Sequence, residues 1–573
     1  MLEFLRPVWS LPQVYADVAI GVFRYVLPIL SLIILYRCGR PLLTFRREPE
    51  IWAWLCMGDG KRFPVHHWEC VIGRSKRSDI VLPYKSVSRN HAVLTRYDDG
   101  SWTISAIGKK SPVLVNGNRI SIREITPDDV ITVGNIKVAL EPVSKEQEAK
   151  LSRLRGQDGG FKTACVTLLF LTILQLCLCL SFLLTCRYED VISIFVGFLG
   201  IFIVQWCLLL FYGVIHRNSF ELETIAFFLC TLGMAVLCAV KPAEVSKQLA
   251  AFVLGVVAFL IVGWSLRDLE RAKLLRRLAA VAGVGLLVLT LVFGTEYYGA
   301  KNWLVIGGVS LQPSELSKVC FVFAGASTMD RIMSKRNIFL FIVYSAMVCI
   351  CLAMMNDFGT ALIFFVAFLI IAYMRSGSVG TIALAIASVV FAGVLVLKIA
   401  PHALRRFENW RHIWESAYDG GYQQTRAIIC LVSGGMLGLG TGQGWLKNLF
   451  AADTDIVFAV LAENWGYILA VISVCFVLVP AFFVLRSVKV GRSSFYSIAG
   501  ATAAGILLMQ TILNVLGTVD VLFLTGVTFP FVSNGGSSMI AAWGLLACIK
   551  SVDTRQNASF TIKQPRQGGK AHA

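Results

Sequence analysis

Residues 162–184 read KTACVTLLFLTILQLCLCLSFLL, a stretch whose only charged residue is Lys162 at its start. About 20 consecutive apolar residues span the hydrocarbon core of a bilayer, so this stretch predicts a transmembrane helix. The sequence is therefore expected to fold as a polytopic α-helical membrane protein. Comparable runs predict further spans at 14–36, 191–213, 222–240, 247–264, 276–293, 314–328, 338–355, 358–374, 380–398, 456–485, 496–516 and 533–550.

The composition agrees with a membrane location. Hydrophobic residues make up 56% of the chain and charged residues 15%, whereas soluble domains carry about 25% charge. The net charge of +18 lies mostly in basic groups at the ends of apolar runs, as in the cytoplasmic flanks of membrane helices. We therefore expect these groups to set the orientation of the helices in the membrane and not to bind nucleic acid. The N-terminus and 400–455 are expected outside the cell, and the loops 267–277, 329–337 and 486–492 in the cytoplasm.

The cysteines indicate neither disulfides nor a metal centre. The chain has 16, most of them inside apolar runs and none in a CxxC pair. A buried free cysteine behaves as a small hydrophobic residue, and we expect that role here.

Residues 50–142 have a different pattern. Short alternating segments such as DIVLP and HAVLTRY are separated by turn residues, including Asn116-Gly117. Period-two alternation with frequent turns predicts a small β-sandwich. The expected domains are an N-terminal anchor with its basic flank (1–49), the sandwich (50–142), a linker (143–160), an extra helical pair (161–220), a membrane core (221–550) and a cytoplasmic tail (551–573).

Three features of the sandwich stand together: Gly73-Arg74 after a strand, Ser88-Arg89-Asn90-His91 before the next, and the later Asn116-Gly117 turn. In this arrangement residues 50–142 resemble the forkhead-associated (FHA) domain, whose members bind phosphothreonine. A guanidinium and hydroxyl or amide donors suit a phosphate. The resemblance implies a phosphopeptide site of Arg74, Ser88, Arg89 and Asn116, with His91 bracing the loop from inside.

One part of the sandwich departs from the family pattern. Where the family usually has Ser-Thr-Asn-Gly, this chain reads Lys109-Lys110-Ser111-Pro112. The basic loop favours an acidic or phosphorylated ligand with a loose sequence preference. A sandwich kept only as a docking surface is the alternative interpretation.

Polar residues next to or inside membrane spans are costly and point to function. They fall into four groups: GAKNWL at 299–304 followed by QPSELSK at 312–318; NDFGT at 356–360; a long outer segment with a glycine-rich run and DTDIVF at 453–458; and PFVSNGGSS at 530–538. In this order and spacing the groups resemble the SEDS (FtsW/RodA) family, over about 221–550. The departures are Asn302 for arginine, Met355-Asn356 for Gln-Pro, Asn464 for glutamate and Asn534 for tyrosine.

The resemblance implies a ten-span core, to which this chain adds about three spans. It also implies a peptidoglycan glycosyltransferase that polymerises lipid II, a disaccharide-peptide on undecaprenyl pyrophosphate, at the outer face of a bacterial cytoplasmic membrane. Asp455 would be the catalytic base, or would hold a divalent cation, Mg²⁺ or Mn²⁺, on the pyrophosphate. The glycine run would let the backbone approach the lipid headgroup closely. The residues assigned to substrate binding are Trp303, Glu315, Lys318, Asp357, Arg405, Arg406, Gln423 and Ser537.

The resemblance also implies partners. These are a class B penicillin-binding protein as transpeptidase and, through the cytoplasmic sandwich, a phosphothreonine protein such as a Ser/Thr kinase target. A lipid II transporter and an inactive scaffold of the division or elongation machinery remain alternative functions. At the level of residues, Glu315–Lys318 could be a structural pair, Arg405 and Arg406 interfacial anchors, and Asp357 or Asp455 a helix cap.

Overall fold

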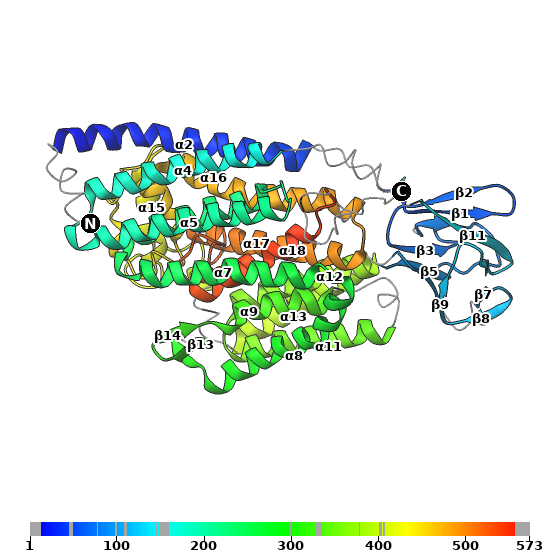
Figure 1. The fold of residues 1–573 in the computed structure, drawn as a ribbon. Coiled ribbons are helices and arrows are strands. Elements are labelled where there is room, and N and C mark those ends of the chain that lie inside the picture. Colours follow the sequence, from blue (N-terminus) through cyan, green and yellow to red (C-terminus); the bar gives the residue numbers. More distant parts are fainter. Residues whose placement is uncertain are drawn as a thin grey trace.

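The computed structural model describes residues 13–44, 50–76, 78–97, 100–107, 112–144, 147, 160–297, 300–326, 335–377, 379–399, 404, 407–555 and 558 of the chain. These residues form a long helical bundle with a β-sandwich at one end (Figure 1). The other end of the bundle is called the distal end below.

Thirteen helices follow the thirteen predicted spans: α2 (Gln13–Thr44), α4 (Phe161–Thr185), α5 (Val191–Val214), α6 (Glu221–Val240), α7 (Val245–Leu266), α8 (Leu269–Phe293), α9 (Pro313–Gly325), α11 (Lys335–Met354), α12 (Phe358–Ser376), α13 (Val379–Ile399), α16 (Val457–Ser487), α17 (Ser494–Thr518) and α18 (Gly536–Ser551). Within the described part of the chain, ten helices are long and apolar enough to cross a membrane. The predicted spans at 314–328 and 533–550 are shorter than expected: α9 has 13 residues and α18 has 16.

The helices that precede the core are joined to it by packing and by buried polar contacts. Gln175 of α4 and Gln205 of α5 exchange two amide hydrogen bonds of 2.9 Å, and Gln175 Nε2 also donates to Thr231 Oγ1 of α6 at 2.9 Å. Between helices in lipid, such side-chain bonds support association. The extra pair is therefore an integral layer of the bundle.

The sandwich consists of two sheets with their own apolar core, which includes Leu55, Ile72, Leu94 and Ile131. The six-stranded sheet has the order β2-β1-β11-β10-β7-β8, and the five-stranded sheet the order β4-β3-β5-β6-β9. The strands are β1 (Ala53–Met57), β2 (Arg62–Val65), β3 (Glu69–Gly73), β4 (Ile80–Val81), β5 (Ala92–Arg96), β6 (Trp102–Ala106), β7 (Val113–Val115), β8 (Asn118–Ile120), β9 (Ile122–Ile125), β10 (Val130–Val133) and β11 (Ile136–Pro142).

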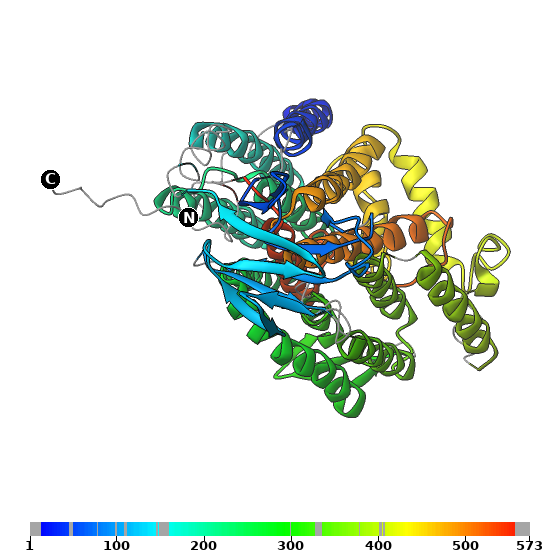
Figure 2. The same ribbon diagram turned by 90° about the vertical axis from the view of Figure 1, so that its right-hand side faces the viewer.

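The sandwich docks on the turn between α16 and α17, and Figure 2 views the bundle from this side. The Trp68 N–H donates to the Arg492 carbonyl at 2.7 Å, and Arg492 pairs with Glu50 at 3.0 Å. Glu69, which is buried, accepts hydrogen bonds from Ser493 Oγ at 2.6 Å and from the Ser494 hydroxyl. Because Ser493 is the N-cap of α17, the sandwich is attached directly to the start of a membrane helix.

The distal end carries non-helical and short helical structure that the span pattern does not predict (Figure 1). A three-stranded sheet has the order β12-β13-β14, with β12 at Thr295–Tyr297, β13 at Ala300–Ile306 and β14 at Val309–Leu311. Helix α15 (Tyr422–Gly434) lies in the segment 400–455. The sandwich and the described residues 407–455, predicted on opposite sides of the membrane, lie at opposite ends of the bundle (Figure 1).

Candidate functional site

A polar cavity of about 130 Å³ lies at the distal end, between the β12–β14 sheet and the helices beside it. All four polar sequence groups contribute to it or adjoin it. Its lining residues include Trp303 of β13, Glu315 of α9, Asp357 and the segment 525–528 between α17 and α18. Segments more than two hundred residues apart therefore form one site.

Asp357 has two tasks in this cavity. Its Oδ1 accepts the Thr360 N–H at 3.1 Å, which caps α12, so the predicted cap role is present. Its Oδ2 accepts hydrogen bonds from Asn302 Nδ2 at 3.2 Å and Gln312 Nε2 at 3.4 Å. Asp357 therefore also organises the polar wall of the cavity.

One departure from the family pattern changes the backbone beside Asp357. Asn356 has a φ of 57°. Asparagine tolerates this left-handed conformation, whereas the proline ring fixes φ near −65°. Proline could not occupy this position without a rearrangement of the turn, which gives a physical reason for asparagine here.

Glu315 and Lys318 form a tight pair in α9. Lys318 Nζ lies 2.6 Å from Glu315 Oε1, and both side chains are buried. Glu315 lines the cavity and Lys318 is its partner one helical turn further on. Removal of either partner would leave an uncompensated buried charge, so Glu315 and Lys318 depend on each other in α9.

Asp455 stands beside the cavity, just before α16. A β-carbon on Gly526, which lines the cavity, would lie only 3.4 Å from Asp455 Oδ2. The Asp455 carbonyl accepts a hydrogen bond of 2.9 Å from Asn514 Nδ2 of α17. The carboxylate is thus at the edge of the cavity on a backbone held from a neighbouring helix.

Part of the glycine-rich run packs inside the protein. A β-carbon on Gly438 would lie 2.3 Å from the Asn464 carbonyl oxygen, and one on Gly434 2.3 Å from that of Ala462. The predicted close approach of this backbone to a lipid headgroup stays a prediction. The run packs directly against α16, and Glu463 Oε1 accepts the Trp445 N–H at 2.7 Å.

Several predicted residues lie away from the cavity. Gln423 Nε2, on α15, donates to the Phe450 carbonyl at 2.9 Å, so it joins two parts of the same distal segment. Ser537 is one layer behind the cavity, where its hydroxyl accepts the Gln312 N–H at 3.2 Å. Arg405 and Arg406 lie outside the described residues.

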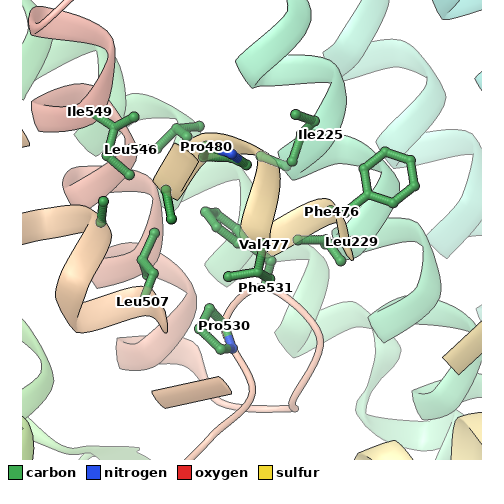
Figure 3. Close-up of a pocket in the computed structure, with 13 residues that line it drawn as sticks. Ile225, Leu229, Phe476, Val477, Pro480, Leu507, Pro530, Phe531, Leu546 and Ile549 are labelled. Carbon is green, nitrogen blue, oxygen red and sulfur yellow. The ribbon is translucent and has the colours of Figure 1, made fainter. Parts of the chain in front are cut away.

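Figure 3 shows a second, apolar cavity of about 20 Å³ inside the bundle. Pro530 and Phe531, from the turn that precedes α18, insert among side chains of α6, α16, α17 and α18. The cavity has room for roughly one water molecule but lacks the polar partners that water needs. The apolar packing of Pro530 and Phe531 around this cavity anchors the 529–535 turn.

The described residues contain no group of three or more His, Cys, Asp or Glu side chains placed to hold a metal ion. A fully protein-bound metal centre is therefore not built into this part of the chain. A single carboxylate beside a polar cavity does fit the way Mg²⁺ is commonly held, by one or two carboxylates together with substrate phosphates. Asp455 matches that donor set.

The sandwich presents the predicted phosphate-binding residues on adjacent loops. The Arg74 N–H donates to the Ser88 carbonyl at 2.9 Å, so the loops that carry Arg74, Ser88 and Arg89 are joined, and both arginine side chains are exposed. His91 is buried; its Nδ1 accepts the Ser88 N–H at 3.1 Å, and its Nε2 lies 3.2 Å from the Pro112 carbonyl. The predicted brace is present, while Lys109, Lys110 and Ser111 lie outside the described residues.

Asn116 has a different position from the other three. Its Nδ2 donates to Asp129 Oδ1, and its Oδ1 accepts the Val130 N–H, at 2.5 and 2.9 Å. The Thr126 N–H and hydroxyl lower the pKa of Asp129 below its ordinary value and keep it a charged acceptor. Both the nitrogen and the oxygen of the Asn116 amide are therefore hydrogen-bonded within the sandwich.

Sequence reasoning missed a second set of functional candidates. The segment 525–528 lines the cavity, and Lys241, Glu244 and Asp453 gather beside Asn534. The available signal was polarity at the distal ends of apolar runs: Lys241 and Glu244 flank Pro242, immediately after α6.

Known protein families match both the membrane core and the sandwich. Residues 206–558 match the family model FtsW/RodA/SpoVE, described as "Cell cycle protein", and residues 57–144 match a model described as "Inner membrane component of T3SS, cytoplasmic domain". A probable peptidoglycan glycosyltransferase FtsW from Tolumonas auensis is 31% identical over 320 residues, which cover 53% of this chain and 82% of that protein.

Solved structures are similar to each part of the chain. RodA from Thermus thermophilus is 22% identical, with a TM-score of 0.43, and covers 58% of this chain and 95% of its own. An FHA domain from Chlamydia trachomatis is 26% identical, with a TM-score of 0.16, and covers 16% of this chain and 99% of its own.

Proposed function

Because the chain belongs to the FtsW/RodA/SpoVE family of cell cycle proteins, we propose that it is a peptidoglycan glycosyltransferase that polymerises lipid II. It is a multi-pass protein of the cytoplasmic membrane, with ten apolar helices in its described part. The observation that carries the proposal is the position of Asp455 at the edge of the polar distal cavity. Relatives at about 30% identity carry the name of this activity.

In this proposal, polymerisation joins the sugar hydroxyl of one lipid II to the anomeric carbon of another chain and releases undecaprenyl pyrophosphate. Asp455 would take the proton of the attacking hydroxyl as general base. The polar wall formed by Asp357, Asn302 and Gln312 would orient the sugars through hydrogen bonds. Trp303, which lines the cavity, would offer an aromatic face to a sugar ring.

The proposal includes a second role for Asp455. Instead of acting as the base, it would bind a divalent cation, Mg²⁺ or Mn²⁺. Asp455 would hold this cation, which would supply positive charge to the pyrophosphate leaving group. Arg405 and Arg406, on the same segment as α15, remain proposed sources of fixed positive charge.

The proposed partners follow from the two parts of the chain. A class B penicillin-binding protein would cross-link the glycan strands that the membrane core makes. The sandwich would bind a phosphothreonine protein, such as a Ser/Thr kinase target, through Arg74, Ser88 and Arg89. A phosphate dianion facing these residues gains one to three charge-assisted hydrogen bonds.

Purified protein mixed with labelled lipid II tests the activity. Glycan chains of many disaccharides on a gel are the expected product. Movement of lipid II between leaflets of a vesicle without polymer would instead identify a transporter, and neither activity would identify a scaffold. The mixture contains no other protein, so any polymer that forms is the product of this chain alone.

The orientation of the chain is tested by cysteine labelling of intact cells. The proposal puts the distal end outside and the sandwich in the cytoplasm, since the basic loops favour the inside. A membrane-impermeant thiol reagent should label Asp419→Cys, on an exposed distal position, and should spare Lys61→Cys in the sandwich. The labelling of the parent protein, which contains the native cysteines, is subtracted as background. Labelling of Lys61→Cys without labelling of Asp419→Cys would overturn the orientation.

A further inference from the structure

The backbone that leads to Asp455 is held at three successive carbonyls by three different donors. The Asp453 carbonyl accepts the Asn534 N–H at 2.8 Å, and the Thr454 carbonyl accepts Ser533 Oγ at 2.6 Å. The Asp455 carbonyl accepts Asn514 Nδ2 at 2.9 Å. With each peptide plane fixed, the direction in which the Asp455 side chain leaves the backbone is fixed as well.

Side chains reinforce the first of these contacts. Asn534 Nδ2 donates to Asp453 Oδ2 at 2.8 Å and to Glu244 Oε2 at 2.9 Å. Asp453 is 1% exposed, and its Oδ1 lies 3.0 Å from Lys241 Nζ. The cation compensates the otherwise costly burial of a carboxylate, so the loop is tied to the start of α7 as well as to the 529–535 turn.

Asparagine is suited to this place because its amide nitrogen offers two donors, and two carboxylates are present to accept them. The tyrosine of the family pattern offers a single hydroxyl donor. The substitution at 534 therefore matches the local partners of this chain.

The turn that supplies Ser533 and Asn534 is itself anchored. Pro530 and Phe531 insert into the apolar interior shown in Figure 3, and Ser533 Oγ accepts the Phe529 N–H at 2.8 Å. One side of the turn is held by apolar packing, and the other side holds the loop before Asp455.

We propose that Asn534, Ser533, Asp453, Lys241 and Glu244 form a distal clamp whose function is to position the Asp455 carboxylate at the cavity. These are positioning residues, and they act on the substrate only through Asp455. The inference rests on the proposed role of Asp455 in glycosyl transfer. It adds to that role a set of residues outside the cavity on which the rate depends.

Kinetics on Asn534→Ala test the clamp. A displacement of a catalytic group by about 1 Å lowers the rate on the order of 100-fold. In Asn534→Ala, kcat for lipid II polymerisation should therefore fall about 10- to 100-fold, while KM changes by less than about threefold. The melting temperature should stay near that of the parent, because the apolar anchor of the turn is kept. Asn448→Ala, an exposed distal asparagine without a described side-chain bond, is the matched control and should behave as the parent.

A double variant separates the clamp from general loosening. If Asn534 acts through Asp453, the combined Asn534→Ala, Asp453→Ala protein should lose little more activity than the weaker single variant, because contacting residues are not additive. Independent losses that multiply, or an unchanged kcat in Asn534→Ala, would overturn the proposal. A fall in activity that only follows a fall in folded protein would do the same.

A readout without catalysis keeps the clamp testable even if the chain does not polymerise lipid II. In an Asp455→Cys background, the rate of thiol modification from the distal side reports how the side chain is held. Asn534→Ala should raise this rate several-fold, and Asn448→Ala should leave it unchanged. Equal rates in all three proteins would reject the clamp, whereas an inactive parent with the expected difference in rates would reject only the proposed activity.

Discussion

Asp455→Ala should abolish glycan polymerisation without loss of membrane insertion. Removal of a general base typically lowers a rate by 10² to 10⁴-fold. The two carboxylates that line the cavity are engaged elsewhere, Asp357 by three donors and Glu315 by Lys318. The measurement is glycan chain length and yield on a gel, at equal amounts of folded protein.

Two further variants sharpen this result. Asp455→Asn keeps the size of the side chain but cannot take a proton, so it should be as inactive as the alanine variant. Asp419→Ala removes an exposed carboxylate from the same distal segment and should keep parental activity. Normal polymer from Asp455→Ala would show that the base lies elsewhere.

Arg74→Ala should remove most of the affinity of the sandwich for phosphothreonine peptides. A hydrogen bond to a charged group contributes about 1.5–3 kcal/mol, which corresponds to roughly 10- to 150-fold in dissociation constant. The full chain in detergent can be titrated with a fluorescent phosphothreonine peptide with acidic neighbours, and binding followed by anisotropy.

The controls distinguish a phosphate site from general charge attraction. The unphosphorylated threonine peptide should bind far more weakly than its phosphorylated form. Arg123→Ala removes the same charge from an exposed position on β9 and should have little effect. Equal binding of both peptides, or no loss in Arg74→Ala, would leave the sandwich as a docking module only.

Local patterns were sufficient for most of the architecture. Apolar runs placed a helix at each predicted span, because a helix in lipid must satisfy its backbone internally. The alternation and turns of 50–142 correspond to eleven short strands. The Ser88–His91 motif correctly implied a buried histidine brace, since that contact lies within one loop.

The site could be predicted only in part, because it is formed by contacts between distant segments. Asp357, Glu315 and Trp303 come together as expected, but nothing local to Gln423 shows that it bonds to Phe450. The close approach of Gly434 and Gly438 to the α16 backbone could not be predicted, because α16 follows the run in sequence without any local signal of that contact. The roles of Asp453 and Asn534 become visible only when the loops are side by side.

The docking of the sandwich has a geometric consequence for any protein it recruits. Glu69 at the start of β3 contacts the membrane helix, while Arg74 follows the other end of the same strand. The strand covers roughly 16 Å at about 3.3 Å per residue. A phosphoprotein bound at Arg74 would therefore sit one short strand away from the start of a membrane helix, and β3 rather than the linker at 143–160 would set its position relative to that helix.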